Sequence, residues 1–379
     1  MKTMKIPVAK PFLGVEEADA AHAAVLSHWV TQGPRVQEFE ENFANFVGSK
    51  HAIAVSNCTT GLHLAMLLAE IGAGDEVICP SMSYIATANC IVYAGAKPVF
   101  AEVGQDYNLD LEDTRSKIGP KTKAILVVHQ VGLPADIDGF RALCDEHNLI
   151  LIEDAACAAG SVYRGKKIGS HSDLVVFSFH PRKVITTGDG GMITTSRDDF
   201  AARARLLRQH GMSVNDRIRH EAKTVIMEDH LEVGYNYRLT DIQAAVGIHQ
   251  LHRLPWLIEE RSKIAEQYLS AFKNLPGIIL PAVPENCSTN WQSFSVLLDS
   301  ESKIDRNELM QVLLDRGVST RRGVMNSHRA TAYAHRNESL PYSEMLEDRS
   351  IILPLYVPMT EEEVAYVIHA FTEEILRLS

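Results

Sequence analysis

Short apolar runs alternate with amphipathic segments through the first two-thirds of the chain, and this alternation predicts βα units. The apolar runs are rich in Val, Ile and Leu and are bounded by turn residues, as is typical of strands buried on both faces. We expect strands at His51–Ser56, Glu76–Cys79, Lys97–Val103, Ala124–Val128, Leu149–Glu153, Leu174–Phe179 and Gly191–Thr194. Helical periodicity separates them at Gly61–Ile71, Ile85–Tyr93 and Ile137–Asn148. The pattern predicts an α/β fold whose mainly parallel sheet carries helices on both faces.

The pattern changes near Thr240, where a long helical region begins. Helical periodicity runs over Leu239–Leu254, and we expect Pro255 to break it before a charged amphipathic continuation over Ile258–Lys273. Beyond that region, the sequence predicts strands mixed with helices at Ser293–Leu298, Arg306–Arg316, Ile351–Leu353 and Glu361–Leu378. We therefore predict an N-terminal arm and large domain over residues 1–250, and a small α+β domain over 251–379.

Composition narrows the classes of partner. The chain has 379 residues and a formal net charge of −11 without a basic block, so we expect neither a nucleic-acid partner nor a polybasic membrane anchor. The six cysteines form no CxxC pair, which argues against a zinc or iron–sulfur site, and we expect no metal. The sequence has no apolar signal region and no run of membrane-spanning length, so we expect a cytoplasmic protein.

Lys183 is the first candidate for chemistry. It follows the strand predicted at Leu174–Phe179 and precedes a glycine-rich turn that ends at Gly191. A deprotonated lysine forms Schiff bases with carbonyl groups, and an open α/β sheet presents its site at the strand ends. The alternative is that Lys183 is a solvated surface residue, which is the usual case for a lysine after a strand.

Two further strand ends carry candidate groups. The strand at Leu149–Glu153 leads into Asp154, which could lie beneath a pyridine ring and keep the ring nitrogen protonated. Alternatively, Glu153 and Asp154 cap a following helix. The turn with Thr59 and Thr60 lies between a strand and a helix, an arrangement that binds phosphate, although either threonine could equally serve as an ordinary N-cap.

Taken together and in order, the motifs resemble the DegT/DnrJ/EryC1/StrS family of pyridoxal-phosphate (PLP) dependent, sugar-type aminotransferases over nearly the whole length. The segments that carry the resemblance are Trp29–Pro34, Thr59–Thr60, Pro80–Asn89, Glu153–Ala156, Phe177–Lys183, Thr186–Gly191, Gly234–Ala245, Trp291–Phe294 and Thr320–Gly323. The resemblance implies PLP fold type I, the aspartate-aminotransferase-like α/β fold.

The resemblance also implies roles for individual residues. Lys183 would hold PLP as the Schiff-base lysine and then move the proton, while Asp154 would pair with the pyridine nitrogen. Tyr84 would stack on the cofactor. Thr59, Thr60 and Ser178 would bind its phosphate, and Asn236 would reach that phosphate from the other subunit of a homodimer with shared active sites. The substrate-side candidates are Thr31, Gln32, Cys157, Arg322 and His328.

The implied reaction moves an amino group from an amino acid, with L-glutamate as the expected donor, to the keto group of a nucleotide-linked sugar. Cys157 stands where such enzymes usually have histidine or glutamine, so a non-sugar ketone or aldehyde stays open as the acceptor. A PLP-dependent sugar dehydratase is a second alternative, disfavoured because relatives of that kind have histidine in place of Lys183. A non-catalytic PLP-binding sensor is a third, without a DNA-binding motif to support it.

Overall fold

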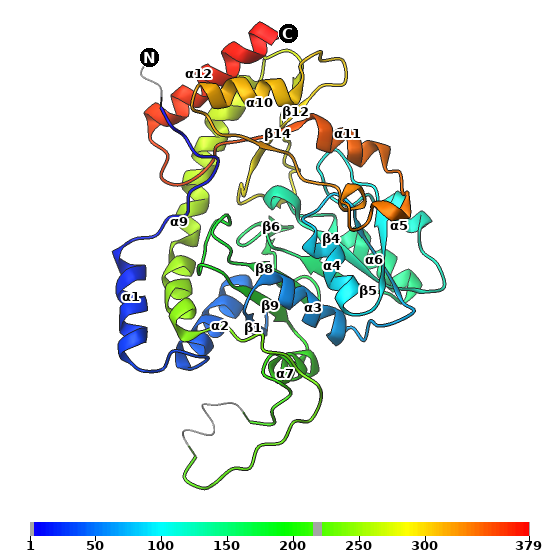
Figure 1. The fold of residues 1–379 in the computed structure, drawn as a ribbon, viewed down its shortest axis with the longest axis vertical. Helices are drawn as coiled ribbons and strands as arrows, with labels where there is room; N and C mark the ends of the chain where they lie inside the picture. Colours follow the sequence, from blue (N-terminus) through cyan, green and yellow to red (C-terminus); the bar gives the residue numbers. More distant parts are fainter. Residues whose placement is uncertain (1–3, 215–221, 379) are drawn as a thin grey trace.

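A seven-stranded sheet forms the centre of the larger body in the computed structural model, which describes residues 4–214 and 222–378 (Figure 1). The strand order is β1-β9-β8-β5-β4-β2-β3. The strands are β1 (His51–Val55), β2 (Glu76–Pro80), β3 (Lys97–Ala101), β4 (Thr122–Val128), β5 (Ile150–Asp154), β8 (Leu174–Ser178) and β9 (Gly191–Thr195). All seven strands were predicted, with bounds within two residues.

β9 alone runs against the direction of the other six strands, pairing antiparallel with β1 and β8. It returns from β8 through the loop of residues 179–190 without a crossover helix, and such a direct return makes an antiparallel pair. The remaining pairs, β8–β5, β5–β4, β4–β2 and β2–β3, are parallel. The prediction of a mainly parallel sheet is confirmed.

Helices cover both faces of this sheet, as the sequence predicts. Alternate residues of β1 enter opposite cores: Ala52 and Ala54 on one side, Ile53 and Val55 on the other. The first core is closed by α2 (Pro34–Val47), α6 (Ile137–His147) and part of α9, and the second by α3 (Cys58–Leu68), α4 (Ala86–Tyr93) and α7 (Asp198–Leu207). Two further helices are α1 (Val15–Leu26), against α9, and α5 (Leu111–Ser116).

The long helix α9 (Asp241–Phe272) runs unbroken through Pro255, so the predicted break is wrong. Leu251, Leu254 and Leu257 are buried on both sides of the proline, and α9 packs against α1 and α2. This packing outweighs the hydrogen bond that a proline removes from a helix interior. The predicted domain boundary at residue 250 falls inside α9, and the division into two domains stays a prediction.

A second, four-stranded sheet lies in the C-terminal part, in the order β10-β12-β14-β13. Its strands are β10 (Ile278–Ile279), β12 (Phe294–Leu298), β13 (Arg321–Arg322) and β14 (Ser350–Leu353). The helices beside it are α10 (Arg306–Asp315), α11 (Pro341–Arg349), α12 (Glu361–Leu378) and the short η2 (Ser327–Arg329) and η3 (Ala334–Arg336). A small third sheet joins β6 (Val162–Tyr163), β7 (Lys166–Lys167) and β11 (Cys287–Ser288), and η1 (Gln130–Gly132) follows β4.

Within the described ranges, no helix is long and apolar enough to cross a membrane.

Candidate active site

The loops that follow β5 and β8 bring Lys183 and Cys157 together. Both strands run in the same direction, so their carboxyl ends meet at one edge of the sheet. The half-buried Lys183 amine donates a hydrogen bond to the Cys157 thiol, with 3.1 Å between Nζ and Sγ. Burial lowers the pKa of Lys183, but Cys157, Cys58 and Asp154 raise it more, and the net direction is upward.

Asp154 ends β5 as a buried carboxylate with few partners. One oxygen accepts from the Ala156 N–H at 3.0 Å, and the other accepts from the Thr87 hydroxyl at 3.0 Å. Burial raises the pKa of Asp154, and Ala156, Lys183 and Thr87 offset this only in part. A positive charge placed against this carboxylate would be stabilised, as a protonated pyridine nitrogen requires.

Glu153 points to the opposite face of the sheet, because successive strand residues alternate. Its carboxylate pairs with His129 across 2.9 Å, and neither side chain is exposed. The other ring nitrogen of His129 accepts from the Ala135 N–H at 3.0 Å, so the nitrogen facing Glu153 carries the proton. A turn, not a helix, follows β5, so the capping interpretation of Glu153 and Asp154 does not hold.

The N-terminus of α3 is capped by Asn57, whose side chain accepts from the Thr60 N–H at 2.9 Å. The N-cap is thus neither Thr59 nor Thr60, although the Thr60 hydroxyl takes part in the capping box. The first N–H groups of a helix have no acceptor inside it. In the described part of the chain, no hydrogen bond takes up those of Cys58 and Thr59, which remain available to an anion.

Two strands bring Ser178 close to this helix end. Ser178, on β8, pairs with Gly191 on β9, and Gly191 also pairs with Val55 at the end of β1. A Cβ at Gly191 would lie 2.7 Å from the Asn57 carbonyl carbon, so glycine allows β9 to touch the turn before α3. The three predicted phosphate-binding residues, Thr59, Thr60 and Ser178, therefore lie around one small region.

Tyr84 lies in the loop between β2 and α4, near Asp154. Its carbonyl accepts from the N–H of Thr87, the residue whose hydroxyl binds Asp154. The Tyr84 side chain is 71% exposed, which leaves its ring free to cover a ligand. Asn236 is also exposed, in a segment that pairs with Gln209. Among the described residues, no hydrogen bond joins Asn236 to Lys183 or Asp154.

Thr31 and Gln32 lie where α2 and α9 begin. The Asp241 N–H donates to the Thr31 carbonyl at 3.0 Å, and the Asp241 carboxylate caps α2 through the N–H groups of Gly33 and Val36. The Gln32 side-chain oxygen is buried without a partner among the described residues. These contacts give Thr31 and Gln32 a fixed backbone but do not test their contact with substrate.

His328 and Arg322 belong to the C-terminal part. His328 is buried, with one ring nitrogen 2.6 Å from the Ser81 hydroxyl and the other 3.0 Å from Glu344. Both nitrogens are used inside the protein, which links η2 to the end of β2. Arg322 is 58% exposed and lies 3.4 Å from Glu347.

Arg321, on β13, lies near Arg182 of the Lys183 loop and near its neighbour Arg322. Burial and the nearby positive charges of Arg182 and Arg322 lower the pKa of Arg321. No carboxylate within the described ranges lies at ion-pair distance from Arg182 or Arg321. Arg322 is one of the substrate-side candidates from the sequence, but Arg182 was missed because nothing local relates it to β13. The amides of Asn290 and Gln292, which also contact the site loops, were missed for the same reason.

The residues fit PLP in three respects. A lysine amine is available, a buried carboxylate lacks a full counter-charge, and the amino end of α3 offers free N–H groups for a phosphate. A metal is not indicated: in the described ranges no group of three or more His, Cys, Asp or Glu side chains could hold one.

The chain matches the sequence model of the DegT/DnrJ/EryC1/StrS aminotransferase family over residues 11–372. Its structure resembles the aminotransferase TlmJ from Streptoalloteichus hindustanus at a TM-score of 0.91 and 34% identity, covering 98% of this chain and 99% of TlmJ. It resembles the PMP form of Spr1654, a putative sugar aminotransferase from Streptococcus pneumoniae, at a TM-score of 0.94 and 26% identity, covering 99% and 100%. Spr1654 is also known in a PLP form.

It also resembles DesI, solved in the presence of its TDP-sugar product. The TM-score is 0.89 and the identity 30%, over 100% of this chain and 94% of DesI. All of these proteins match along nearly the entire chain, so the likeness includes both the seven-stranded and the four-stranded sheets.

Proposed function

The chain belongs to the DegT/DnrJ/EryC1/StrS aminotransferase family and is a PLP-dependent aminotransferase with fold type I, and we propose that it transfers an amino group to a nucleotide-linked keto-sugar, with Lys183 as the residue that holds the cofactor. L-Glutamate is the proposed amino donor. The observation that carries the proposal is the meeting of the Lys183 amine with Cys157 beside the buried Asp154 carboxylate. When bound, PLP supplies an electron sink next to the amino carbon of the substrate.

Lys183 is proposed to hold the cofactor and to move a proton between the two carbon atoms that flank the transferred nitrogen. A lysine can do this only after its amine loses a proton. The Cys157 sulfur is an acceptor for that amine at 3.1 Å, so the lysine nitrogen has a defined resting place when it does not hold cofactor. Asp154 is proposed to hold the proton on the pyridine nitrogen, with Thr87 and Ala156 orienting its two oxygens.

The phosphate is proposed to bind at the amino end of α3. The N–H groups there and the positive end of the helix favour an anion. Thr59, Thr60 and Ser178 lie around the same region, and Tyr84 is free to cover the ring. Thr31, Gln32, Cys157 and His328 remain candidates for the substrate side.

A diphosphate is the feature of the acceptor that the charge pattern supports. Arg182 precedes Lys183 directly, and Arg321 lies near both Arg182 and Arg322. The positive charges of Arg182 and Arg322 repel that of Arg321, and a diphosphate would offset this repulsion through bidentate hydrogen bonds. DesI, which shares the fold and 30% of its residues with this chain, has a TDP-sugar product.

A homodimer is proposed because one segment of the body exposes apolar side chains. Val225, Met227, Leu231 and Val233 are between 63% and 91% exposed, in a segment that projects beyond α7 (Figure 1). Apolar groups gathered in this way usually mark an interface. Asn236 lies at the end of the same segment and is the residue proposed to enter the partner's site.

The test is an absorbance spectrum of the PLP-loaded protein with and without L-glutamate, for the wild type and for Lys183→Ala. We expect a lysine-dependent band that glutamate converts in the wild type only. Nucleotide keto-sugars are then offered to the glutamate-treated protein, with simple ketones and aldehydes in parallel. Return of the original band with a keto-sugar alone supports the proposal. Return with a simple ketone alone, or no response to glutamate, contradicts it.

A further inference from the structure

A strap of residues 289–292 crosses the active-site side of the sheet and contacts both loops that carry Lys183 and Cys157. The strap, with the sequence Thr-Asn-Trp-Gln, joins β11 to β12 in the C-terminal part of the chain. Its two carboxamide side chains, Asn290 and Gln292, make hydrogen bonds to backbone groups of the two loops.

Gln292 holds the two peptide groups that flank Lys183. Its side-chain oxygen accepts from the Val184 N–H at 3.1 Å, and its side-chain nitrogen donates to the Arg182 carbonyl at 2.7 Å. The peptide before Lys183 and the peptide after it are therefore fixed by one carboxamide. Rotation of the backbone at Lys183 would break at least one of these bonds.

Asn290 holds the loop of Cys157 in the same way. Its side-chain nitrogen donates to the carbonyls of Cys157 at 2.8 Å and Ala159 at 3.0 Å, and its backbone N–H donates to the Ser161 hydroxyl at 3.1 Å. Asn290 is fully buried, so water does not compete for these bonds. Its side-chain oxygen accepts from the Gln292 N–H at 2.9 Å, which couples the two carboxamides.

The strap is itself held in an unusual conformation. Trp291 has φ of 50°, a left-handed backbone conformation that is unfavourable for a non-glycine residue and persists only where the surroundings impose it. Arg261 of α9 donates to the carbonyls of Trp291 and Gln292 at 2.8 and 2.9 Å. Burial lowers the pKa of Arg261 to about 9, which leaves the guanidinium charged at neutral pH.

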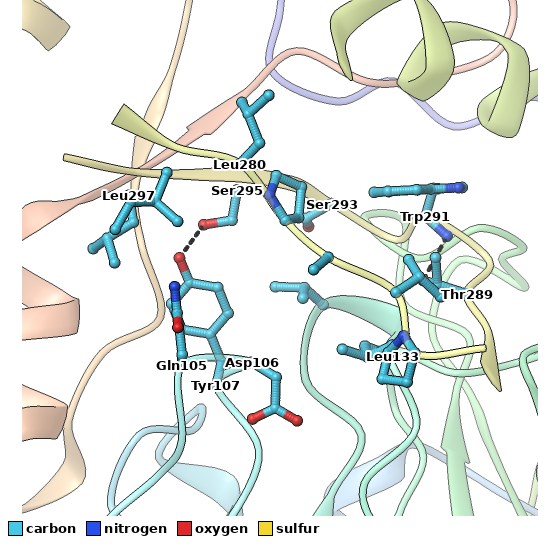
Figure 2. A pocket seen from close by; sticks show the side chains of 16 residues that line it. Gln105, Asp106, Tyr107, Leu133, Leu280, Thr289, Trp291, Ser293, Ser295 and Leu297 are labelled. Carbon is cyan, nitrogen blue, oxygen red and sulfur yellow. Dashed lines mark hydrogen bonds between the residues drawn. The ribbon is translucent and has the colours of Figure 1, made fainter. Parts of the chain in front are cut away.

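The outer side of the strap faces a cavity of about 360 Å³, lined in part by Tyr107, Trp291 and Ser295 (Figure 2). Figure 2 also shows the backbone N–H of Trp291 directed at the Thr289 hydroxyl, to which it donates at 3.1 Å. Thr289 and Trp291 thus line this cavity, whereas Asn290 and Gln292 are not part of its lining and bind the two loops instead.

We propose that Asn290 and Gln292 are positioning residues that hold the Lys183 nitrogen and the Cys157 sulfur at the relative positions that the reaction requires. This inference rests on the role of Lys183 given under the proposed function. Neither carboxamide needs to touch cofactor or substrate, because each acts through the backbone of a loop. A displacement of about 1 Å at a reacting group can lower a rate about 100-fold, so fixing these two loops matters for the chemistry.

The experiment compares PLP-loaded wild type with Gln292→Leu and Asn290→Asp. Leucine removes both hydrogen bonds of Gln292 at similar size, whereas aspartate keeps the acceptor for the Gln292 N–H and removes the two donors. Gln311→Leu is the control, because it removes a side-chain hydrogen bond to Asp315 on the exposed face of α10. The readouts are the glutamate half-reaction, the pH midpoint of the lysine-dependent absorption band, PLP content and thermal unfolding.

We expect Gln292→Leu and Asn290→Asp to slow the half-reaction about 10-fold to 100-fold and to move the pH midpoint, with PLP content retained. Gln311→Leu should change neither the rate of the half-reaction nor the pH midpoint of the absorption band. A Gln292→Leu protein with an unchanged pH midpoint overturns the inference, even if it is less stable, since that result indicates a structural role only. If Gln292→Leu does not fold, Gln292→Glu, which keeps the acceptor for Val184, is judged by the same midpoint.

The same spectra separate this inference from the role of Lys183. If Lys183→Ala retains the band, the assignment of Lys183 fails and the positioning inference fails with it. If Lys183→Ala lacks the band and the Gln292 and Asn290 variants match the wild type, only the positioning inference is overturned.

Discussion

The Lys183 amine donates to the Cys157 thiol across 3.1 Å, so the proposed Schiff-base lysine contacts a position where the family resemblance led us to expect histidine or glutamine. A thiol is a weaker hydrogen-bond partner than the side chains of histidine or glutamine. The contact nevertheless contributes to the upward shift in the pKa of Lys183, which burial alone would lower. Cys157 thus affects the protonation of the amine on which cofactor loading depends.

Replacing Cys157 by alanine is expected to let cofactor-free protein take up PLP at lower pH. The amine attacks the cofactor carbonyl only when deprotonated, so the uptake rate rises as the pH passes through the pKa of Lys183. Cys157→Ala removes a partner that raises this pKa, and the midpoint of the rate profile should move down. The measurement is the rate of growth of the lysine-dependent band as a function of pH.

Cys144→Ala is the matched control for this comparison. Cys144 is a buried free cysteine on α6, in the core beneath the sheet. Its removal should reduce stability without moving the midpoint of PLP uptake. Equal midpoints in Cys157→Ala and the wild type would show that the thiol has no influence on Lys183.

Asp154→Asn is expected to bind PLP but to react with glutamate at least about 100-fold more slowly, the usual size of the loss when one preorganised electrostatic partner is removed. The amide cannot hold a proton on the pyridine nitrogen, although it fills the same space. Thr87→Val, which removes one of the carboxylate's two hydrogen bonds, should have a smaller effect. Single-turnover rates with glutamate measure both. An Asn variant as fast as Thr87→Val would argue against the proposed pairing.

The strands and their chemistry were readable from the sequence because the relevant signals are local. Buried strands leave continuous apolar runs, and Asp154 and Lys183 follow such runs directly. A helix break was predicted at Pro255 because proline has a low helix propensity. In the folded chain, the packing of Leu251 and Leu257 on either side of the proline stabilises one continuous helix. Some helices, α1 and α2 among them, were not predicted, and α1 is alanine-rich with only a weak apolar face.

The hydrogen bonds by which Asn290 and Gln292 hold the site loops could not be predicted from the sequence. Gln292 contacts Val184 across 108 positions of the chain, and Asn290 contacts Cys157 across 133. A carboxamide that binds backbone groups requires no particular side chain on the loop. The sequence of the loop therefore does not predict the carboxamide, and the carboxamide does not predict which loop it binds. The tetrapeptide Trp291–Phe294 supported the family resemblance. Its contacts with the Lys183 loop, made by Gln292, are visible only in the folded structure.

Glu153→Gln is expected to lower the free energy of unfolding by about 1.5–3 kcal/mol at neutral pH, the range for a hydrogen bond to a charged group. Burial raises the pKa of Glu153, but the hydrogen bond from His129 and the other groups around the carboxylate outweigh this, and the net shift is downward from 4.5. A carboxyl with a depressed folded-state pKa stabilises the protein above its unfolded pKa. That contribution is lost as the pH falls through the folded-state pKa.

The wild type and Glu153→Gln should therefore converge in stability on acidification below 4.5, which urea unfolding at a series of pH values measures. Glu146→Gln is the control, because Glu146 pairs with Arg115 on the surface and its loss should leave stability unchanged within error. A difference between wild type and Glu153→Gln that does not shrink with falling pH would show that Glu153 is not charged in the folded protein.

Gly191→Ala is expected to weaken PLP binding about 10-fold or more and to cost about 1–3 kcal/mol of stability, the usual cost of overpacking. The added Cβ would lie 2.7 Å from the Asn57 carbonyl carbon and 2.8 Å from the Cys58 nitrogen. Both atoms belong to backbone that cannot rotate aside, so α3 must move away from β9. That movement separates the helix N–H groups from Ser178, which pairs with Gly191.

The matched control is Gly119→Ala, since a Cβ at Gly119 meets no heavy atom within 4 Å. This variant should bind PLP as the wild type does and be as stable or slightly more so, because alanine restricts the unfolded chain. PLP dissociation constants and thermal unfolding of the two variants separate a local from a general effect. If Gly191→Ala loses stability but keeps its PLP affinity, the phosphate does not depend on the contact between β9 and α3. The anion site would then have to lie away from the start of this helix.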